Sequence, residues 1–208
     1  MDELKKSTSP RPYRMGRRRE QLDAMRERIT EAAFELHCTI GPAQTTISAV
    51  ADLAGVQRHT VYHHFPDLRS LIRACTEHAV LYTGFPEAAP WSAIDDPTVR
   101  LRRALGELYG FYRANAQALG NIIRDLPMMT EVGGVEPLLE RMTELFSAIA
   151  AGWPGDAATQ RIRMAAIGHA IAYPTWKSLT DYGLSDTEAA DLMVRLVAGV
   201  KDPVKSRQ

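Results

Sequence analysis

Apolar residues along most of the chain recur at steps of three or four, which is the period of an amphipathic α-helix. The first stripe begins at Leu22 and passes through Met25 and Ile29 to Leu36. Further stripes fall within residues 68–82, 97–112, 118–126, 136–151, 156–181 and 186–200. No segment keeps the two-residue alternation of a half-buried strand. The pattern therefore predicts an all-α protein of about nine helices.

Capping residues and helix breakers set the expected boundaries. Thr46, or Thr45 before it, caps a short helix that Gly55 ends, because glycine adopts the left-handed backbone without a steric penalty. Asp96-Pro97 and the capping box Ser185-x-x-Glu188 each open a helix. The sequence thus marks its helix starts clearly.

Prolines and glycines predict the interruptions. Residues 84–97 contain three prolines and no helical period, which predicts a loop or hinge. Pro127 and Gly133-Gly134 are expected to separate two helices. Pro174 is expected to kink a long helix over residues 156–181.

Composition narrows the class of protein. Of 208 residues, 45% are apolar and 24% are charged, the net charge is zero, and only two cysteines occur, without a CxxC pair. These values indicate a globular chain with buried thiols and argue against a disulfide framework or zinc ribbon. No apolar run reaches the length of a membrane span and no signal-peptide pattern is present, so we expect a cytoplasmic protein without membrane contact.

The charge distribution is uneven at the N-terminus. Residues 1–19 hold seven basic and two acidic side chains in a segment rich in Pro and Ser. We expect residues 1–18 to form a flexible basic arm, which either follows a phosphate backbone or serves as a solvated tail.

Residues 47–65 carry the most specific pattern. Two short helices are joined by a turn at Ala54-Gly55-Val56, and Val50 and Val61 hold them together. This is the layout of a helix-turn-helix, whose second helix enters the major groove of DNA. The second helix, residues 57–64, exposes hydrogen-bond donors, a cation and aromatic rings, and it contains no acid.

At this point the sequence resembles the tetracycline-repressor (TetR) family of bacterial transcription regulators. The resemblance covers residues 26–72, and its most distinctive part is Gly55-Val56 followed by Thr60-Val61-Tyr62-His63-His64-Phe65. It implies a three-helix DNA-binding domain over residues 19–66. It also implies a helical domain over residues 67–208 that binds a small effector and forms a homodimer.

The resemblance assigns roles to individual residues. Thr46 matches a phosphate-contacting hydroxyl, Arg58 and His59 match positions that read base edges, and Tyr62 with His64 matches phosphate contacts. The expected DNA-binding residues are Thr46, Gln57, Arg58, His59, Thr60, Tyr62, His63 and His64.

The second half of the chain carries no local motif. Ligand pockets are mostly apolar with few polar groups. From the aromatic, methionine and histidine residues of this half we therefore select five candidates for binding a hydrophobic or aromatic effector, namely Tyr109, Met128, Met142, His169 and Tyr173. The last two long stripes, at residues 162–179 and 192–200, are expected to form the dimer interface.

Other functions are less well supported by the sequence. It contains no nucleophile elbow, P-loop or dinucleotide-binding motif, so we expect neither enzymatic activity nor a cofactor. His59 and His63 have the spacing of metal ligands but lack a third ligand, so no metal is expected. The remaining alternatives are a DNA-binding regulator without small-molecule control and a small helical enzyme.

Overall fold

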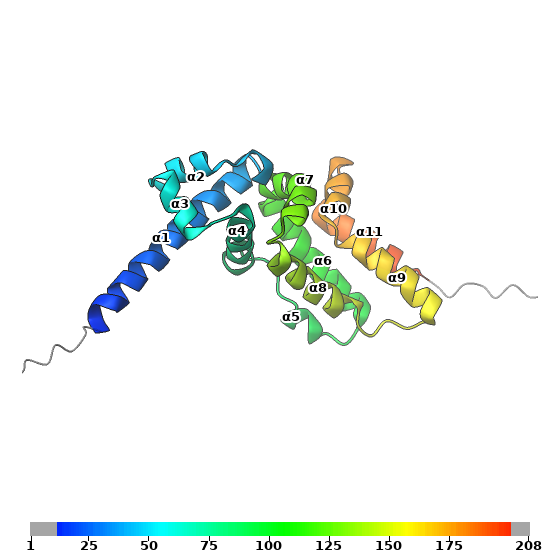
Figure 1. Cartoon of the computed structure of the whole chain (residues 1–208). Coiled ribbons are helices and arrows are strands. Elements are labelled where there is room, and N and C mark those ends of the chain that lie inside the picture. Colours follow the sequence, from blue (N-terminus) through cyan, green and yellow to red (C-terminus); the bar gives the residue numbers. More distant parts are fainter. Residues whose placement is uncertain (1–11, 201–208) are drawn as a thin grey trace, which may run out of the picture.

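The computed structural model describes residues 12–200, and within them it contains eleven α-helices, one short 3-10 helix and no strand (Figure 1). The prediction of an all-α fold is confirmed. The elements in chain order are α1 (Pro12–Thr39), η1 (Pro42–Gln44), α2 (Ile47–Ala54), α3 (Arg58–His64), α4 (Leu68–Tyr82), α5 (Ala89–Ser92), α6 (Pro97–Ala114), α7 (Ala116–Val132), α8 (Glu136–Ala150), α9 (Ala157–Ala170), α10 (Tyr173–Asp181) and α11 (Asp186–Ala198).

Helices α1, α2 and α3 pack around one apolar core. Val50 of α2 and Val61 of α3 are fully buried in it. The Thr46 hydroxyl accepts a hydrogen bond from the Ala49 N–H at 3.1 Å and so caps α2, as predicted. Gly55 ends α2 in the left-handed conformation, at φ 64° and ψ 39°. The turn between α2 and α3 therefore depends on this glycine.

Helix α4 links the N-terminal helices to the rest of the chain and is buried on two sides. Leu71 packs into the core of α1–α3, whereas its neighbour Ile72 packs with Met129 of α7. Both α4 side chains are at most 1% exposed. The predicted domain boundary after residue 66 falls just before this helix, which contributes to two different cores.

The loop between α7 and α8 lies directly on α4. Gly133 and Gly134 have φ values of 89° and 96°, which favour glycine. The Gly134 carbonyl oxygen lies 2.8 Å from the Thr76 hydroxyl of α4. A β-carbon on Gly134 would lie 2.5 Å from the backbone oxygen of Arg69, so only glycine permits this approach.

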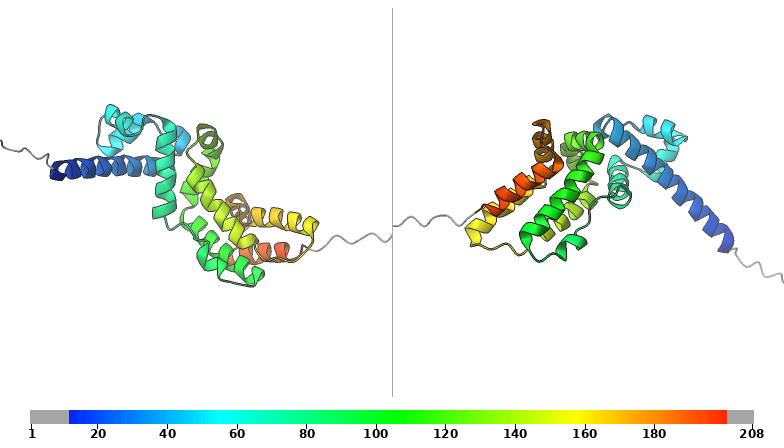
Figure 2. Two further views of the ribbon diagram at one scale, coloured as in Figure 1. Left: turned by 60° about the horizontal axis from the view of Figure 1, so that its bottom comes forward. Right: turned by 180° about the vertical axis from the view of Figure 1, so that it is seen from behind.

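The C-terminal helices α5, α6 and α8–α11 surround a larger core (Figure 2). Two tyrosines of α6 are buried within it, and their hydroxyls donate to the carbonyls at the end of α9. Tyr109 reaches Ala170 at 2.7 Å, and Tyr112 reaches Ile171 at 2.6 Å. These bonds fix the position of α6 against α9.

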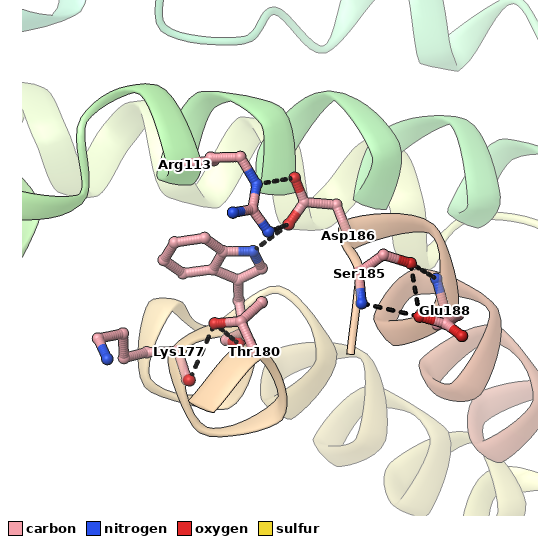
Figure 3. A network of polar contacts seen from close by, with 7 residues as sticks. Arg113, Lys177, Thr180, Ser185, Asp186 and Glu188 are labelled. Atoms are coloured by element: carbon pink, nitrogen blue, oxygen red, sulfur yellow. Dashed lines mark hydrogen bonds and ion pairs between the residues drawn. The ribbon is translucent and has the colours of Figure 1, made fainter. Parts of the chain in front are cut away.

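Helix α11 begins at a polar junction with α6 and α10 (Figure 3). Asp186 accepts two hydrogen bonds from Arg113 of α6, at 2.6 and 2.7 Å, and one from the Trp176 indole N–H at 2.8 Å. Ser185 and Glu188 form the predicted capping box. The carboxylate of one residue thus ties three helices together.

Several boundaries differ from the sequence expectation. Pro127 lies inside α7, because the hydrogen bond that proline removes is offset by the packing of Leu126 and Met129 in the contact with α4. Pro174 does not kink a long helix. It lies in the first turn of α10, where no backbone donor is needed, and α9 has already ended at Ala170. The break between α9 and α10 and the one-turn helix α5 explain part of the difference between the eleven helices of residues 12–200 and the predicted number of about nine.

Part of the expected flexible arm is helical instead. Helix α1 starts at Pro12, since proline's fixed φ suits the first helical position. Residues 12–18 are therefore helical, and residues 1–11 lie outside the described residues. In both views of Figure 2 the first part of α1 extends away from the other helices, and the described arginines Arg17, Arg18 and Arg19 are exposed on it. Among residues 12–200, no helix combines the length and apolar character that crossing a bilayer requires.

Replacing Gly134 by Ala should destabilise the protein much more than replacing Gly84. Both glycines have positive φ, but a β-carbon at Gly84 meets nothing within 4 Å. We expect about 1 kcal/mol for Gly84→Ala from backbone strain and about 3 kcal/mol for Gly134→Ala from strain plus overpacking. Urea unfolding followed by circular dichroism measures both, and equal losses would contradict the close approach of the loop to α4.

Candidate nucleic-acid interface and cavity

Helix α3 presents its polar side chains outward. Val61 is its only fully buried residue. Tyr62 is 47% exposed, so part of its side chain is available for contact. Of the other predicted DNA-binding residues on or next to α3, those that are exposed are Gln57, Arg58, His59 and His63, and those that are half-buried are Thr60 and His64.

The charge on this face suits a polyanion. Helix α3 carries Arg58 and three histidines and no carboxylate. Thr46 is exposed at the start of α2, and its hydroxyl oxygen accepts from Ala49, so its own hydrogen remains able to donate. Helix-turn-helix proteins use such hydroxyl, amide and cationic donors to contact phosphates and base edges.

The end of α3 is held by α1. One guanidinium nitrogen of Arg26 donates to the His64 carbonyl at 2.7 Å, and the same guanidinium lies 4.2 Å from the centre of the Phe65 ring. Burial, together with His63 and Arg26, lowers the pKa of His64. His64 is therefore neutral near pH 7 and can serve as a hydrogen-bond partner rather than as a cation.

Side chains of helix α7 form hydrogen bonds with the backbone at and just after the C-terminal end of α1. The Asn121 amide donates to the carbonyls of Cys38 and Thr39, at 2.9 and 3.0 Å. Arg124 donates to the Ile40 carbonyl at 3.1 Å, and Asp125 accepts from the Ala43 N–H at 3.0 Å. We refer to Asn121, Arg124 and Asp125 as the α7 clamp.

A cavity of about 250 Å³ lies between the N-terminal helices, which include α1 and α4, and the C-terminal helices, which include α6, α7 and α8. Its walls come from α1 and α4 on one side and from α6, α7, α8 and the segment after α4 on the other. It is lined by Phe34, His37, Cys38, Cys75, Thr76, Ala79, Thr83, Phe85, Phe111, Asn115, Ala118, Leu119, Ile122, Met129 and Leu138. The cysteines are free thiols whose pKa values are raised by burial. Within residues 12–200, no three His, Cys, Asp or Glu side chains are grouped to hold a metal ion.

The five residues selected from the sequence for ligand binding do not line this cavity. They are Tyr109, Met128, Met142, His169 and Tyr173. They lie on five different helices, and only Tyr109, Met142 and Tyr173 belong to the same apolar core. Their assignment stays a prediction that this cavity does not support.

Three of these residues have other partners or surroundings. The buried Tyr109 hydroxyl already donates to Ala170, and the Tyr173 hydroxyl donates to Ala116 at 2.8 Å beside an open surface depression. His169 is exposed rather than in the core, with a ring nitrogen 3.3 Å from the Thr175 hydroxyl. His37 and Cys38, near the end of α1, line the cavity together with Phe34 of the same helix.

The exposed α3, the glycine turn before it and the buried Val61 define a helix-turn-helix DNA-binding protein. Residues 29–75 match the family model described as bacterial regulatory proteins, tetR family. The resemblance of this N-terminal segment to the tetR family is therefore confirmed. A comparison with curated proteins gave no significant match.

Solved structures share the fold over most of the chain. A TetR-like transcriptional regulator from Rhodococcus sp. RHA1 is 21% identical with a TM-score of 0.60, covering 83% of this chain and 93% of that one. AibR, in complex with isovaleryl coenzyme A and operator DNA, is 17% identical with a TM-score of 0.60, covering 83% and 97%. FadR from Bacillus subtilis, in complex with stearoyl-CoA, is 14% identical with a TM-score of 0.57, covering 84% and 98%.

Replacing Asp125 by Asn should loosen the α7 clamp in a pH-dependent way. Arg124 is the main cause that lowers the Asp125 pKa below its ordinary 3.8, so the carboxylate stabilises the fold above that pH. We expect a loss of about 1–2 kcal/mol at pH 7, which shrinks as the pH falls below about 4 and the native carboxylate becomes protonated. Unfolding curves at several pH values measure this difference. Asp191→Asn, at a half-exposed pair with Arg102, is the control and should lose less than about 1 kcal/mol.

Proposed function

We propose that this chain is a repressor rather than an enzyme. As a homodimer it binds a palindromic operator through α3, and a small hydrophobic effector in the cavity between the two helix groups releases it. The observation that carries the proposal is the position of the cavity. Phe34 and His37 of α1 and Cys75 of α4 form one wall, so a bound molecule touches the helices that hold α3 as well as α6 and α7.

The lining of the cavity and the structural neighbours support a hydrophobic effector. The lining is mostly apolar and contains no Asp, Glu, Lys or Arg. AibR and FadR are described with isovaleryl coenzyme A and stearoyl-CoA, thioesters that carry an apolar acyl part. The cavity of about 250 Å³ lies below the roughly 300–1,000 Å³ of sites for drug-sized ligands. A whole coenzyme A thioester is too large to be enclosed, so the effector is a smaller molecule or only an acyl group enters.

The release mechanism acts through α4. A ligand that displaces α4 also displaces α3, because Leu71 and Val61 share one core. A dimer fits its operator only when the two α3 helices keep the spacing of successive major grooves. A 100-fold release requires the ligand to favour the non-binding state by about 2.7 kcal/mol, within the usual range of coupling between sites.

Exposed apolar residues on α9 and α11 support the dimer. Ile162 of α9 is 47% exposed and Leu196 of α11 is 56% exposed, and the two helices pack against each other. Two copies of this pair would form a four-helix interface around a two-fold axis. That symmetry matches the two half-sites of a palindrome.

Replacing Arg58 by Ala should weaken operator binding by about 1–3 kcal/mol per half-site if its guanidinium grips a guanine. The measurement is fluorescence anisotropy with a duplex selected by the wild-type protein from a random library. Arg102→Ala removes the same charge from α6 and should leave the affinity unchanged. Failure to select any duplex would refute operator binding, and an unaffected Arg58→Ala would exclude its base contact.

Replacing Leu196 by Glu should convert the dimer into a monomer, because the carboxylate would be buried without a partner in the interface. Sedimentation velocity at micromolar concentration distinguishes the two states. Leu81→Glu is the control, since Leu81 is 68% exposed on α4, outside the proposed interface. A monomeric wild-type chain would end the proposal of a dimer.

A further inference from the structure

His37 is a buried polar residue whose hydrogen-bonding groups are unused. Its side chain lines the cavity and the residue is 3% exposed. Within residues 12–200 its ring makes no hydrogen bond to the protein. Burial lowers its pKa to about 4, and the nearby Asp125 only partly opposes this effect. The ring is therefore neutral at pH 7 and offers one N–H donor and one nitrogen acceptor.

Each of the other hydroxyl and amide side chains of the cavity already donates at least one hydrogen bond to the backbone. The Thr83 hydroxyl donates to the Ala79 carbonyl at 2.6 Å, and the Asn115 amide donates to the Phe111 carbonyl at 2.9 Å. The Thr76 hydroxyl bonds the backbone of its own helix and of the α7–α8 loop. Because no charged side chain lines the cavity, an ionised ligand group would be buried there without a counter-charge.

His37 also lines a second cavity. This one, of about 270 Å³, lies beneath α3 and is lined by residues that include Thr46, Tyr62, Phe65 and Leu68. Of the described residues that line either cavity, His37 alone belongs to both. A movement of the His37 ring therefore changes the shape of the cavity directly beneath the DNA-binding helix.

We propose that the ligand of the larger cavity is a small, uncharged, mostly apolar molecule with one carbonyl or hydroxyl group, and that this group hydrogen-bonds the His37 ring. This assignment rests on the proposed function and names its ligand class. The same bond makes His37 the residue through which the ligand acts on the space beneath α3.

The test compares acetophenone with ethylbenzene, which has the same ring and nearly the same size but no carbonyl. Isothermal titration calorimetry with the full-length chain gives the dissociation constants of acetophenone and ethylbenzene, for the wild type and for His37→Leu. The affinity ratio of acetophenone to ethylbenzene should fall about tenfold in His37→Leu, because one hydrogen bond is lost. Thr83→Val and Asn115→Leu are matched controls and should keep the wild-type ratio.

Three results would overturn the proposal. They are a ratio that His37→Leu leaves unchanged, a ratio that falls in Asn115→Leu instead, and no binding of either compound at millimolar concentration. Phenylacetate should bind at least tenfold more weakly than acetophenone, and tighter binding of this anion would refute an uncharged ligand. Should His37→Leu fail to fold, the wild-type nitrogen-15 signals of the His37 ring decide, since acetophenone should shift them and ethylbenzene should not.

Operator binding separates this inference from the proposed function. Acetophenone should lower the operator affinity of the wild type but not that of His37→Leu. If acetophenone binds through His37 and operator affinity stays the same, the ligand assignment stands and release by a ligand fails.

Discussion

The structure depends on α4 being buried from two sides at once. Leu71 and Ile72 are adjacent in the sequence, yet one completes the core beneath α3 and the other packs against α7. One turn later the pattern repeats, because Cys75 faces the N-terminal core while Thr76 reaches the backbone of Gly134. Protein cores are close-packed, so α4 cannot shift against one neighbour without disturbing the other. The position of α3 is thereby tied to the arrangement of the C-terminal helices.

The α7 clamp makes a second connection between the same two groups of helices. It holds the end of α1 mainly through main-chain groups, namely the carbonyls of residues 38–40 and the N–H of Ala43. These backbone partners are present whatever the side chains are, so the contact depends on the geometry of α1 and not on its sequence. The cavity is lined by α1, α4 and α7, the helices that these two connections join. A molecule that enters must fit this space or move one of the two connections.

Local signals in the sequence predict the local structure well. Thr46, Asp96 and the Ser185–Glu188 box all cap helices where expected, because a cap needs only a side-chain oxygen and the next backbone N–H groups. The exposed face of α3 follows from the position of Val61 alone. The cavity could not be found this way, since its walls join residues more than 80 positions apart, such as His37 and Leu119. Selecting aromatic residues in the second half of the chain instead led to Tyr109, whose hydroxyl the core itself uses.

The energy needed for control is modest relative to what a small ligand supplies. A ligand of micromolar affinity provides about 8 kcal/mol of binding free energy, and a 100-fold effect on the operator uses about 2.7 kcal/mol of it. Only this third of the binding free energy must differ between the two states of the protein. The rest comes from apolar contacts that the ligand makes in both states. Contacts with apolar lining residues such as Phe111 suit the shared part. The part of the binding free energy that differs between the two states should come from a ligand contact with a residue that also lines the cavity under α3. Among the described residues, that residue is His37.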